Sequence, residues 1–215
     1  MQVLKRANYL APFEPKKLRK WISWGARKSE YREDMEYNLF NKLVPVLVDG
    51  VSTVEINQTL IRLCLEEEDI EYSRLASEIE RAMIFKNQEH ALGIYQPESV
   101  DYCDFIEAMQ LKGLYDGDWI DQVWYNEELV NEWYIELEAL SLEYWTVKQW
   151  VEKYSIKIDG EPVETPAQGA LAIALALHGV TGIAFELAKD MCTYKTNLPT
   201  PVMNGCRDGN FDTIS

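Results

Sequence analysis

The chain has 215 residues, 47% of them hydrophobic, and a formal net charge of −15. This is enough for a sizeable core in one domain or two small ones. The negative charge argues against nucleic-acid binding, which needs a basic face. No apolar run reaches the roughly 18 residues of a membrane span, and no signal-peptide pattern opens the chain, so we expect a cytoplasmic protein.

Charge is unevenly distributed along the chain. Residues 1–28 hold eight basic residues and one acid, for a net charge of +7. A small basic patch on an acidic protein suits a compact anion such as a nucleotide phosphate. A solvated basic helix face explains the same pattern, and charge alone does not separate the two readings.

The first part of the chain predicts a short strand at residues 2–6 followed by helices. Pro15 suits the first turn of a helix, where its missing N–H is not needed. Ser52 and Glu55 form an S-x-x-E capping box that opens another helix. Gly93 and Pro97 mark a probable subdomain boundary. The expected helices cover about residues 15–26, 30–48, 52–66 and 71–90.

The second part also predicts helices, interrupted by one hairpin. Asp159-Gly160 supplies the positive φ angles of a type I′ turn. The stretch that Thr165-Pro166 opens is apolar nearly all round, so we expect a buried helix. His178 at its end is expected to complement the helix dipole rather than to catalyse. The expected helices cover about 99–112, 126–144, 145–153, 166–178 and 182–194.

Metal chemistry is not expected. None of the four cysteines forms a C-x-x-C pair, and only two histidines could assist them. Cys64 and Cys103 lie among apolar helical residues, which favours buried, reduced thiols. The acidic face of the helix expected at 126–144 is interpreted as solvated rather than as a carboxylate metal site.

Three groups of segments occur in a familiar order. "VLKR", "FEPKKLRKWISWGA", "DGVSTVEINQTLIR" and "RAMIF…LGIYQP" resemble an ATP-cone, a nucleotide-sensing domain. "LSLEYWTVKQWVEKYSIKIDGEPVETPAQGALAIALALH" resembles the helical region that follows the cone in ribonucleotide reductase large subunits. "LPTPVMNGCR" is close to that family's "LPTP-[IV]-M-x-G-x-R" segment and is the most specific of the three. The whole chain resembles the N-terminal part of a class Ia large subunit, most closely that of bacteria and tailed phages.

The resemblance implies a mainly α fold with three parts. An ATP-cone-like helical domain with a small β cap would cover residues 1–93. The helical N-terminal domain, with a β-hairpin near 155–164, would cover 94–195. Residues 196–215 would begin the first strand of the family's α/β barrel, together with its substrate loop.

The resemblance also implies an allosteric site for ATP or dATP in the cone. Lys5 and Arg6 would contact phosphate, with Lys17 on the first helix and Thr53 at the start of the third. The family's V-x-K-R-D-G reads "VLKRAN" here, so Asn8 replaces a glycine. Asn tolerates the left-handed conformation better than most residues, which would preserve the turn. Glu89 stands near the position of a basic residue of the family.

Thr200 and Ser215 are the substrate-binding candidates that the resemblance implies. In the family, the threonine at the position of Thr200 contacts the substrate diphosphate. The small residue at the position of Ser215 precedes the first redox cysteine. That cysteine would be the next residue, beyond this sequence. Cys206 matches a variable position, so we expect no catalytic residue in residues 1–215.

The implied reaction is the reduction of ribonucleoside diphosphates for DNA synthesis. The expected partners are a complementary C-terminal large-subunit chain with the catalytic cysteines, a small subunit with a di-iron tyrosyl radical, and a second large subunit in a homodimer. Thioredoxin or glutaredoxin would be the external reductant. A split phage gene and a truncated fragment both explain the length, and a stand-alone nucleotide sensor or scaffold is the alternative from another class.

Overall fold

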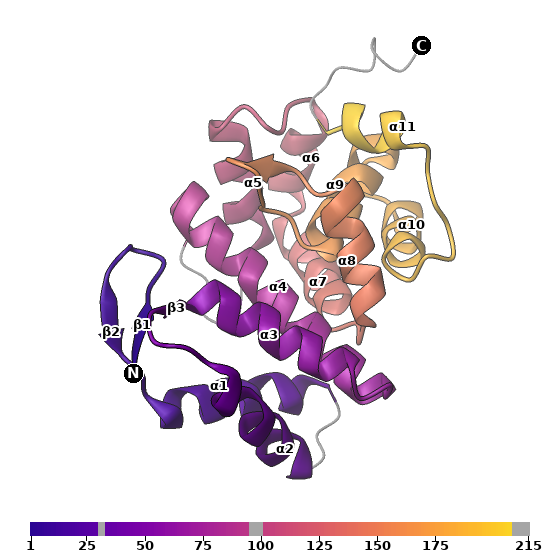
Figure 1. The fold of residues 1–215 in the computed structure, drawn as a ribbon. Helices are drawn as coiled ribbons and strands as arrows, with labels where there is room; N and C mark the ends of the chain where they lie inside the picture. Colours follow the sequence, from indigo (N-terminus) through magenta and orange to yellow (C-terminus); the bar gives the residue numbers. More distant parts are fainter. Residues whose placement is uncertain (30–32, 95–100, 208–215) are drawn as a thin grey trace. The chain divides into compact units, whose positions relative to one another are not determined.

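The computed structural model of the chain describes residues 1–29, 33–94 and 101–207 (Figure 1). Helices dominate and two small sheets accompany them, which confirms the expected mainly α fold. Among the described residues, no helix is both long and apolar enough to cross a bilayer. The helices are α1 (Pro15–Lys28), α2 (Glu33–Leu43), 3₁₀ helix η1 (Val44–Val46), α3 (Thr53–Leu65), α4 (Ile70–Leu92), α5 (Tyr102–Leu111), α6 (Trp119–Tyr125), α7 (Glu127–Glu138), α8 (Tyr144–Lys153), α9 (Pro166–His178), α10 (Gly182–Cys192) and α11 (Thr200–Gly205). The strands are β1 (Gln2–Leu4), β2 (Leu10–Pro12), β3 (Val51–Ser52), β4 (Lys157–Ile158) and β5 (Glu161–Pro162).

The chain divides into two compact units. The first comprises Met1–Met83 with Ser141–Trp145, and the second comprises Ile84–Leu140 with Thr146–Ser215. Helix α4 is continuous through this division and contributes to both units. This division lies inside a helix that has no local signal for a break, and the domain boundary that we expected near Gly93 stays a prediction.

The first unit combines a three-stranded sheet with helices. Strand β1 lies in the centre, antiparallel to β2 and parallel to β3. Helix α2 packs against both α1 and α3. Helix α1 buries Leu18, Ile22 and Ala26, which recur at steps of four and so share one face. The apolar residues buried around them include Met35, Leu39, Leu43, Leu60, Leu75 and Ile79.

The second unit is built around α9. This helix is buried from Pro166 to Leu175 and packs against α10, α7 and α6 (Figure 1). The prediction of a buried helix is confirmed, as is its capping by Thr165, whose side chain accepts from the amide of Gln168. The hairpin β4–β5 is also confirmed, with Asp159 at φ 52° and Gly160 at φ 84°.

Two predicted helices have the wrong bounds. Residues 126–144 do not form one helix, because Asn126 leaves the helical conformation between α6 and α7, and α7 already ends at Glu138. Helix α7 buries Val130, Tyr134 and Leu137. The helix expected at 30–48 is described from Glu33, and α2 ends at Leu43. Pro45 follows within η1, and a proline disfavours α conformation in the residue before it.

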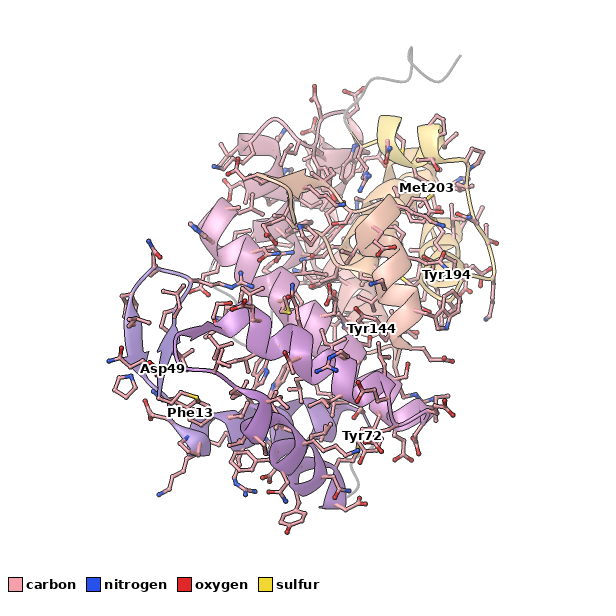
Figure 2. The ribbon with its side chains drawn as sticks, viewed as in Figure 1. Phe13, Asp49, Tyr72, Tyr144, Tyr194 and Met203 are labelled. Atoms are coloured by element: carbon pink, nitrogen blue, oxygen red, sulfur yellow. The ribbon has the colours of Figure 1, made fainter. Side chains whose placement is uncertain are left out.

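The strand expected to begin in residues 196–215 is absent from the described part, residues 196–207. Residues 200–205 form the short helix α11 instead, with Pro201 in its first turn, where proline is tolerated. Met203 (Figure 2), Cys206 and Arg207 are buried, and their spacing of three and four places them on one helical face. Burial of that face explains the helix. Residues 208–215 lie outside the described residues.

Candidate functional site

The sheet of the first unit brings three of the predicted nucleotide-binding residues to one edge. Strands β1 and β3 run parallel, and Leu4 of β1 pairs with Ser52 of β3. Lys5 comes directly after Leu4 and Thr53 directly after Ser52, so both lie at the same end of the sheet. Neighbouring strands lie about 4.8 Å apart. Lys5 and Arg6 are half-buried, and Lys5 forms no ion pair with another described residue.

The turn after β1 keeps its shape without glycine. Asn8 adopts φ 58°, in the left-handed region, and its amide donates to the carbonyl of Lys5 at 2.8 Å. The amide of Lys5 donates to the carbonyl of Tyr9 at 2.9 Å. Asn8 therefore takes the conformation that a glycine would adopt more readily.

The N-terminus of α3 lies at the same edge of the sheet. Ser52 is its N-cap, and the predicted capping box is present: Glu55 N donates to Ser52 Oγ at 3.1 Å and Ser52 N donates to Glu55 Oε2 at 2.8 Å. These bonds from Ser52 lower the pKa of Glu55. The first-turn amides of Thr53 and Val54 have no acceptor within the helix and can bind an anion, but the Glu55 carboxylate already complements part of the dipole.

Lys17 lies apart from this edge. The amide of Phe13 (Figure 2) donates to the carbonyl of Met1 at 3.1 Å, so α1 begins near the amino end of β1, whereas Lys5 follows its carboxyl end. The three residues of β1 span about 10 Å. The Nζ atom of Lys17 lies 2.6 Å from Glu14 Oε1, and both side chains are exposed.

The basic segment 1–28 is partly neutralised within its own unit. Arg19 Nη1 lies 2.7 Å from Glu36 Oε1, and its guanidinium lies 3.8 Å from the centre of the Phe40 ring. Lys28 Nζ lies 5.2 Å from the ring of Trp24. Some basic residues of this segment are therefore paired along α1, while Lys5 stands at the edge of the sheet where α3 begins.

The expected reversal of charge at Glu89 is also compensated. Glu89 Oε2 lies 2.6 Å from Lys86 Nζ one turn earlier on α4, and this pair belongs to the second unit. The pair lowers the net charge that Glu89 presents to solvent.

In the second unit, Thr200 is exposed at the start of α11. Ser215 lies outside the described residues. The other end of α11 is held firmly, because Met203 is 1% exposed and Cys206 is fully buried in the core. Thr200 thus stands at the free end of a short helix whose opposite end is anchored.

Directly after Cys206, Arg207 belongs to a buried polar cluster that the sequence analysis did not predict. Glu164 and Arg207 are 0% and 1% exposed and form an ion pair through Oε2 and Nη1. Tyr115 donates its hydroxyl proton to Glu164 Oε1, and the amide of Ile156 donates to Oε2 at 2.7 Å. Both charged residues stand in the quoted motifs, Glu164 in "ETP" and Arg207 at the end of "LPTPVMNGCR". Their pairing is a tertiary contact that no local pattern reveals.

The cluster shifts the ionisation of its members. Burial first, and then the negative charge of Glu164, raises the pKa of Tyr115 well above its usual value. Burial disfavours the charged form of Arg207, but the Glu164 carboxylate outweighs it and keeps the pKa of Arg207 raised. Tyrosine remains a neutral donor and arginine a cation over the whole physiological range.

Next to this cluster, hydrogen bonds from side-chain amide and hydroxyl groups hold the start of α9. Gln88 Nε2 donates to the carbonyl of Val163 at 2.8 Å and to Gln168 Oε1 at 2.6 Å. The hydroxyl of Tyr102 donates to the carbonyl of Gln168 at 3.0 Å, and Thr165 Oγ1 donates to Glu138. The Glu-Thr-Pro segment is therefore a buried junction of the second unit.

The four cysteines form no disulfide in the described part of the chain. All four are buried and reduced, which confirms the interpretation of Cys64 and Cys103. Burial, followed by the Asp101 carboxylate, raises the pKa of Cys103 to about 12. Cys206 Sγ makes a long contact, 3.8 Å, with the carbonyl of Met203. A thiol that stays protonated is a poor nucleophile.

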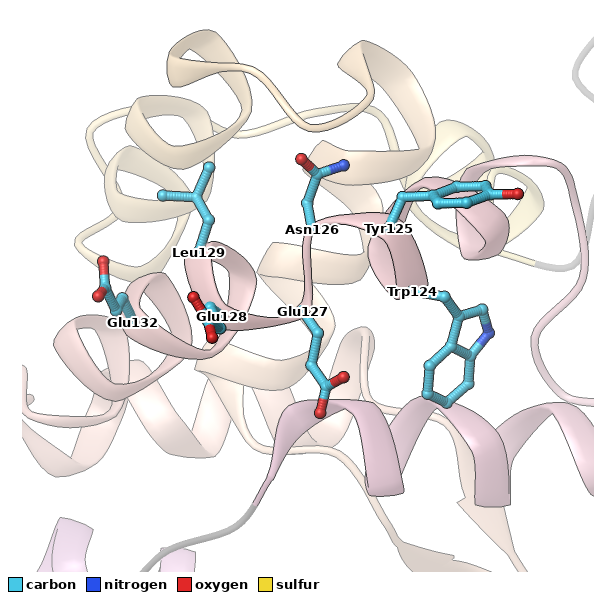
Figure 3. Close-up of a pocket in the computed structure, with 7 residues that line it drawn as sticks. All are labelled: Trp124, Tyr125, Asn126, Glu127, Glu128, Leu129 and Glu132. Carbon is cyan, nitrogen blue, oxygen red and sulfur yellow. The ribbon is translucent and has the colours of Figure 1, made fainter.

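An open pocket of about 440 Å³ lies at the turn between α6 and α7 (Figure 3). Three carboxylates, two aromatic rings, a leucine and an asparagine line it, and none of the predicted site residues does. Tyr125 is 89% exposed and Leu129 40% exposed. The lining residues are Trp124, Tyr125, Asn126, Glu127, Glu128, Leu129 and Glu132.

Comparison with known proteins finds sequence similarity in both units. Residues 1–82 match the family described as ATP cone domain. Over 96% of its length the chain is 27% identical to the ribonucleoside-diphosphate reductase subunit alpha of Enterobacteria phage T4, of which it covers 28%. It is 23% identical over 95% of its length to the corresponding subunit of Buchnera aphidicola, covering 28% of it. It is 25% identical over 74% of its length to ribonucleoside-diphosphate reductase 1 subunit alpha of Escherichia coli, covering 22%.

The chain thus spans less than a third of the length of the curated relatives that it matches. The cone match covers the first unit up to the division inside α4. The likeness to the alpha subunits continues well past the cone into the second unit. The chain therefore carries an ATP-cone domain at residues 1–82 and is a homologue of the ribonucleoside-diphosphate reductase alpha subunits.

Proposed function

We propose that residues 1–215 act as the N-terminal part of a ribonucleoside-diphosphate reductase large subunit. The observation that carries this proposal is the similarity to the phage T4 alpha subunit over 96% of the chain, which extends far beyond the cone. The reaction would reduce ribonucleoside diphosphates to deoxyribonucleoside diphosphates in the cytoplasm. The buried cysteines favour a division of labour in which this part supplies regulation and substrate contacts while a complementary chain supplies the reactive thiols.

The first unit would bind ATP or dATP as effectors. A nucleotide phosphate would lie at the sheet edge, between the cations of Lys5 and Arg6 and the free amides at the start of α3, because charge-assisted hydrogen bonds are strong. The adjoining sugar and base would extend along β1 toward Lys17. Glu55 limits the affinity, since its carboxylate lies in the same helical turn.

The second unit would contribute Thr200 and Ser215 to the substrate diphosphate. Thr200 supports this role by its exposure at the free end of α11. The remaining partners are a radical-generating small subunit, whose di-iron tyrosyl radical starts the chemistry, a second large subunit, and thioredoxin or glutaredoxin as reductant.

Reconstitution tests the reductase role. The chain is mixed with the complementary large-subunit chain and the small subunit, and deoxynucleoside diphosphate formation is measured. We expect product only when all three are present and none from this chain alone. Absence of product with every component folded contradicts the proposal, and Thr200→Val should raise KM for substrate where Thr193→Val, on another exposed threonine, should not.

Calorimetry with ATP and dATP tests the effector site. Lys5→Ala should weaken binding about tenfold or more, because one charge-assisted contact is lost. Thr53→Val should weaken it by a smaller factor. Lys20→Ala removes a comparable charge from the exposed face of α1 and should leave affinity unchanged. Equal losses in Lys5→Ala and Lys20→Ala would show only a general effect of charge.

A stand-alone nucleotide sensor or scaffold is the second candidate. It is favoured by the fact that the family match covers residues 1–82 alone. This role would be supported over the reductase role if the chain bound ATP or dATP tightly but formed no complex with the complementary large-subunit chain or the small subunit.

A further inference from the structure

The ion pair of Glu164 and Arg207 joins three segments of the second unit that lie far apart in sequence. Arg207 Nη2 donates to the carbonyl of Tyr154 at 3.0 Å and to Asn204 Oδ1 at 3.2 Å. The amide of Asp116 donates to the carbonyl of Arg207 at 2.9 Å. One side chain and its backbone thus connect the end of α8, the loop before α6 and the end of α11.

A buried ion pair is a weak source of net stability, because removing both charges from water offsets most of their attraction. Helix α11 also has an apolar attachment in Met203 and Cys206, which are buried beside Arg207. Apolar burial is non-directional and allows a short helix to slide or rotate. Hydrogen bonds from a planar guanidinium restrict both movements, since their geometry is fixed. The pair is therefore better suited to orient α11 than to attach it.

The orientation of α11 decides where Thr200 stands. Helix α11 has six residues, and from Thr200 to Arg207 the chain advances only about 10 Å at the helical rise of 1.5 Å per residue. Thr200 lies at the exposed end of the segment 200–207 and Arg207 at its buried end. Arg207 is also the last described residue before the segment that leads to Ser215. In sequence, Arg207 therefore stands between the two substrate-binding candidates, Thr200 and Ser215.

We propose that Arg207 is a positioning residue of the substrate segment, which holds Thr200 in place through its buried pair with Glu164. This inference rests on the proposed reductase function for its effect on substrate binding. Its structural part, that the pair fixes α11, stands without that function. Arg207 itself is buried and would affect the substrate only through α11.

Hydrogen–deuterium exchange on the whole chain tests the structural part. In Arg207→Met, exchange of residues 198–207 should rise about tenfold or more, because the charge-assisted bonds that resist local opening are gone. Exchange of residues 171–175 in the middle of α9 should rise much less, since these residues are buried among apolar side chains and not against Glu164. Lys189→Met is the matched control, because it removes an exposed pair with Glu136 in the same unit, and it should change neither segment. No rise in residues 198–207, or an equal rise in residues 171–175, overturns the inference.

Arg207→Lys covers the case in which Arg207→Met does not fold. Lysine keeps the charge opposite Glu164 but lacks the fork that also reaches Tyr154 and Asn204. We expect a smaller rise in exchange of residues 198–207, with the circular dichroism of the parent chain. Unchanged exchange in this folded variant also overturns the inference.

The reconstituted reductase gives the functional readout. Arg207→Lys should raise KM for the nucleoside diphosphate about tenfold and change kcat less, since misplacement of Thr200 weakens substrate binding. If the parent chain forms no product, the reductase role fails and the exchange data still decide whether Arg207 fixes α11. If the parent is active and KM does not change in Arg207→Lys, the positioning role fails while the reductase role stands.

Discussion

Gly169 on α9 lies against the ring of Trp150, and this contact makes Gly169→Ala informative. A Cβ atom added at Gly169 would lie 2.5 Å from Cζ2 and 3.3 Å from Nε1 of the indole. Ordinary contacts of Cβ atoms lie at 3.4–4 Å, so the ring must move by nearly 1 Å. Trp150 is only 1% exposed, and its ring lies 5.5 Å from that of Tyr154 between centroids, tilted by 59°. A rigid, enclosed ring has little room to move.

Two opposing effects set the magnitude. Overpacking a core costs about 1–3 kcal/mol, and replacing glycine by alanine inside a helix returns up to about 1 kcal/mol. We expect Gly169→Ala to lower the free energy of unfolding of the second unit by about 1–2 kcal/mol, or roughly 4 °C in Tm per kcal/mol. Urea and thermal unfolding followed by circular dichroism measure this change.

Gly25→Ala in α1 is the matched control. Its added Cβ would lie 2.6 Å from Cδ1 of Leu75, the end of a flexible side chain that rotates more easily than an indole. The gain in helix propensity should leave Gly25→Ala within about 1 kcal/mol of the parent. Trp150→Phe removes the clashing atoms, so combining it with Gly169→Ala should show a favourable coupling of about 1 kcal/mol. A Gly169→Ala variant as stable as the parent would refute the steric reasoning.

Four further predictions concern the first unit and the thiol of Cys103. Ser52→Ala should lower the free energy of unfolding of the cone by about 1 kcal/mol, because the N-cap acceptor is lost. The pKa of Glu55 is lowered in the folded state, so its stabilising contribution is present above its unfolded pKa and is lost as pH falls through the folded one; urea unfolding from pH 7 to pH 3 should show a smaller loss in Glu55→Gln than in the parent. Asn8→Gly should stabilise the turn by a few tenths of a kcal/mol without weakening ATP binding, since φ 58° suits glycine, whereas Asn8→Ala should destabilise it; a calorimetric and unfolding series decides. Cys103, with its pKa raised to about 12, should be alkylated roughly a thousandfold more slowly at pH 8 in the folded than in the unfolded chain, and equal rates by mass spectrometry would contradict its burial.

Local signals predicted several elements well. The capping box of α3 and the cap of α9 by Thr165 each place a side-chain acceptor three residues before its donor, and the Asp159-Gly160 turn needs only two positive φ angles. Each depends on neighbours in sequence, and each is present. The uniformly apolar composition of α9 likewise predicted its burial, because such a helix has no face suited to water.

Longer-range features were predicted less well. The expected helix at 126–144 was wrong, because apolar spacing does not reveal that Asn126 leaves the helical conformation. The extended segment at Thr200 became a helix because its other end has a core to bury against. These outcomes depend on partners that lie elsewhere in the chain.

The sequence by itself determined the fold class, the order of the pieces and the residues that could meet a nucleotide, because caps, turns and motifs act over a few residues. The tertiary structure alone decided which of them meet. The parallel pairing of β1 with β3 brings Lys5 to the start of α3, while Lys17 follows the far end of the hairpin. The pairing of Glu164 with Arg207 joins residues 43 positions apart, since a buried charge is stable only where the fold supplies its counter-charge.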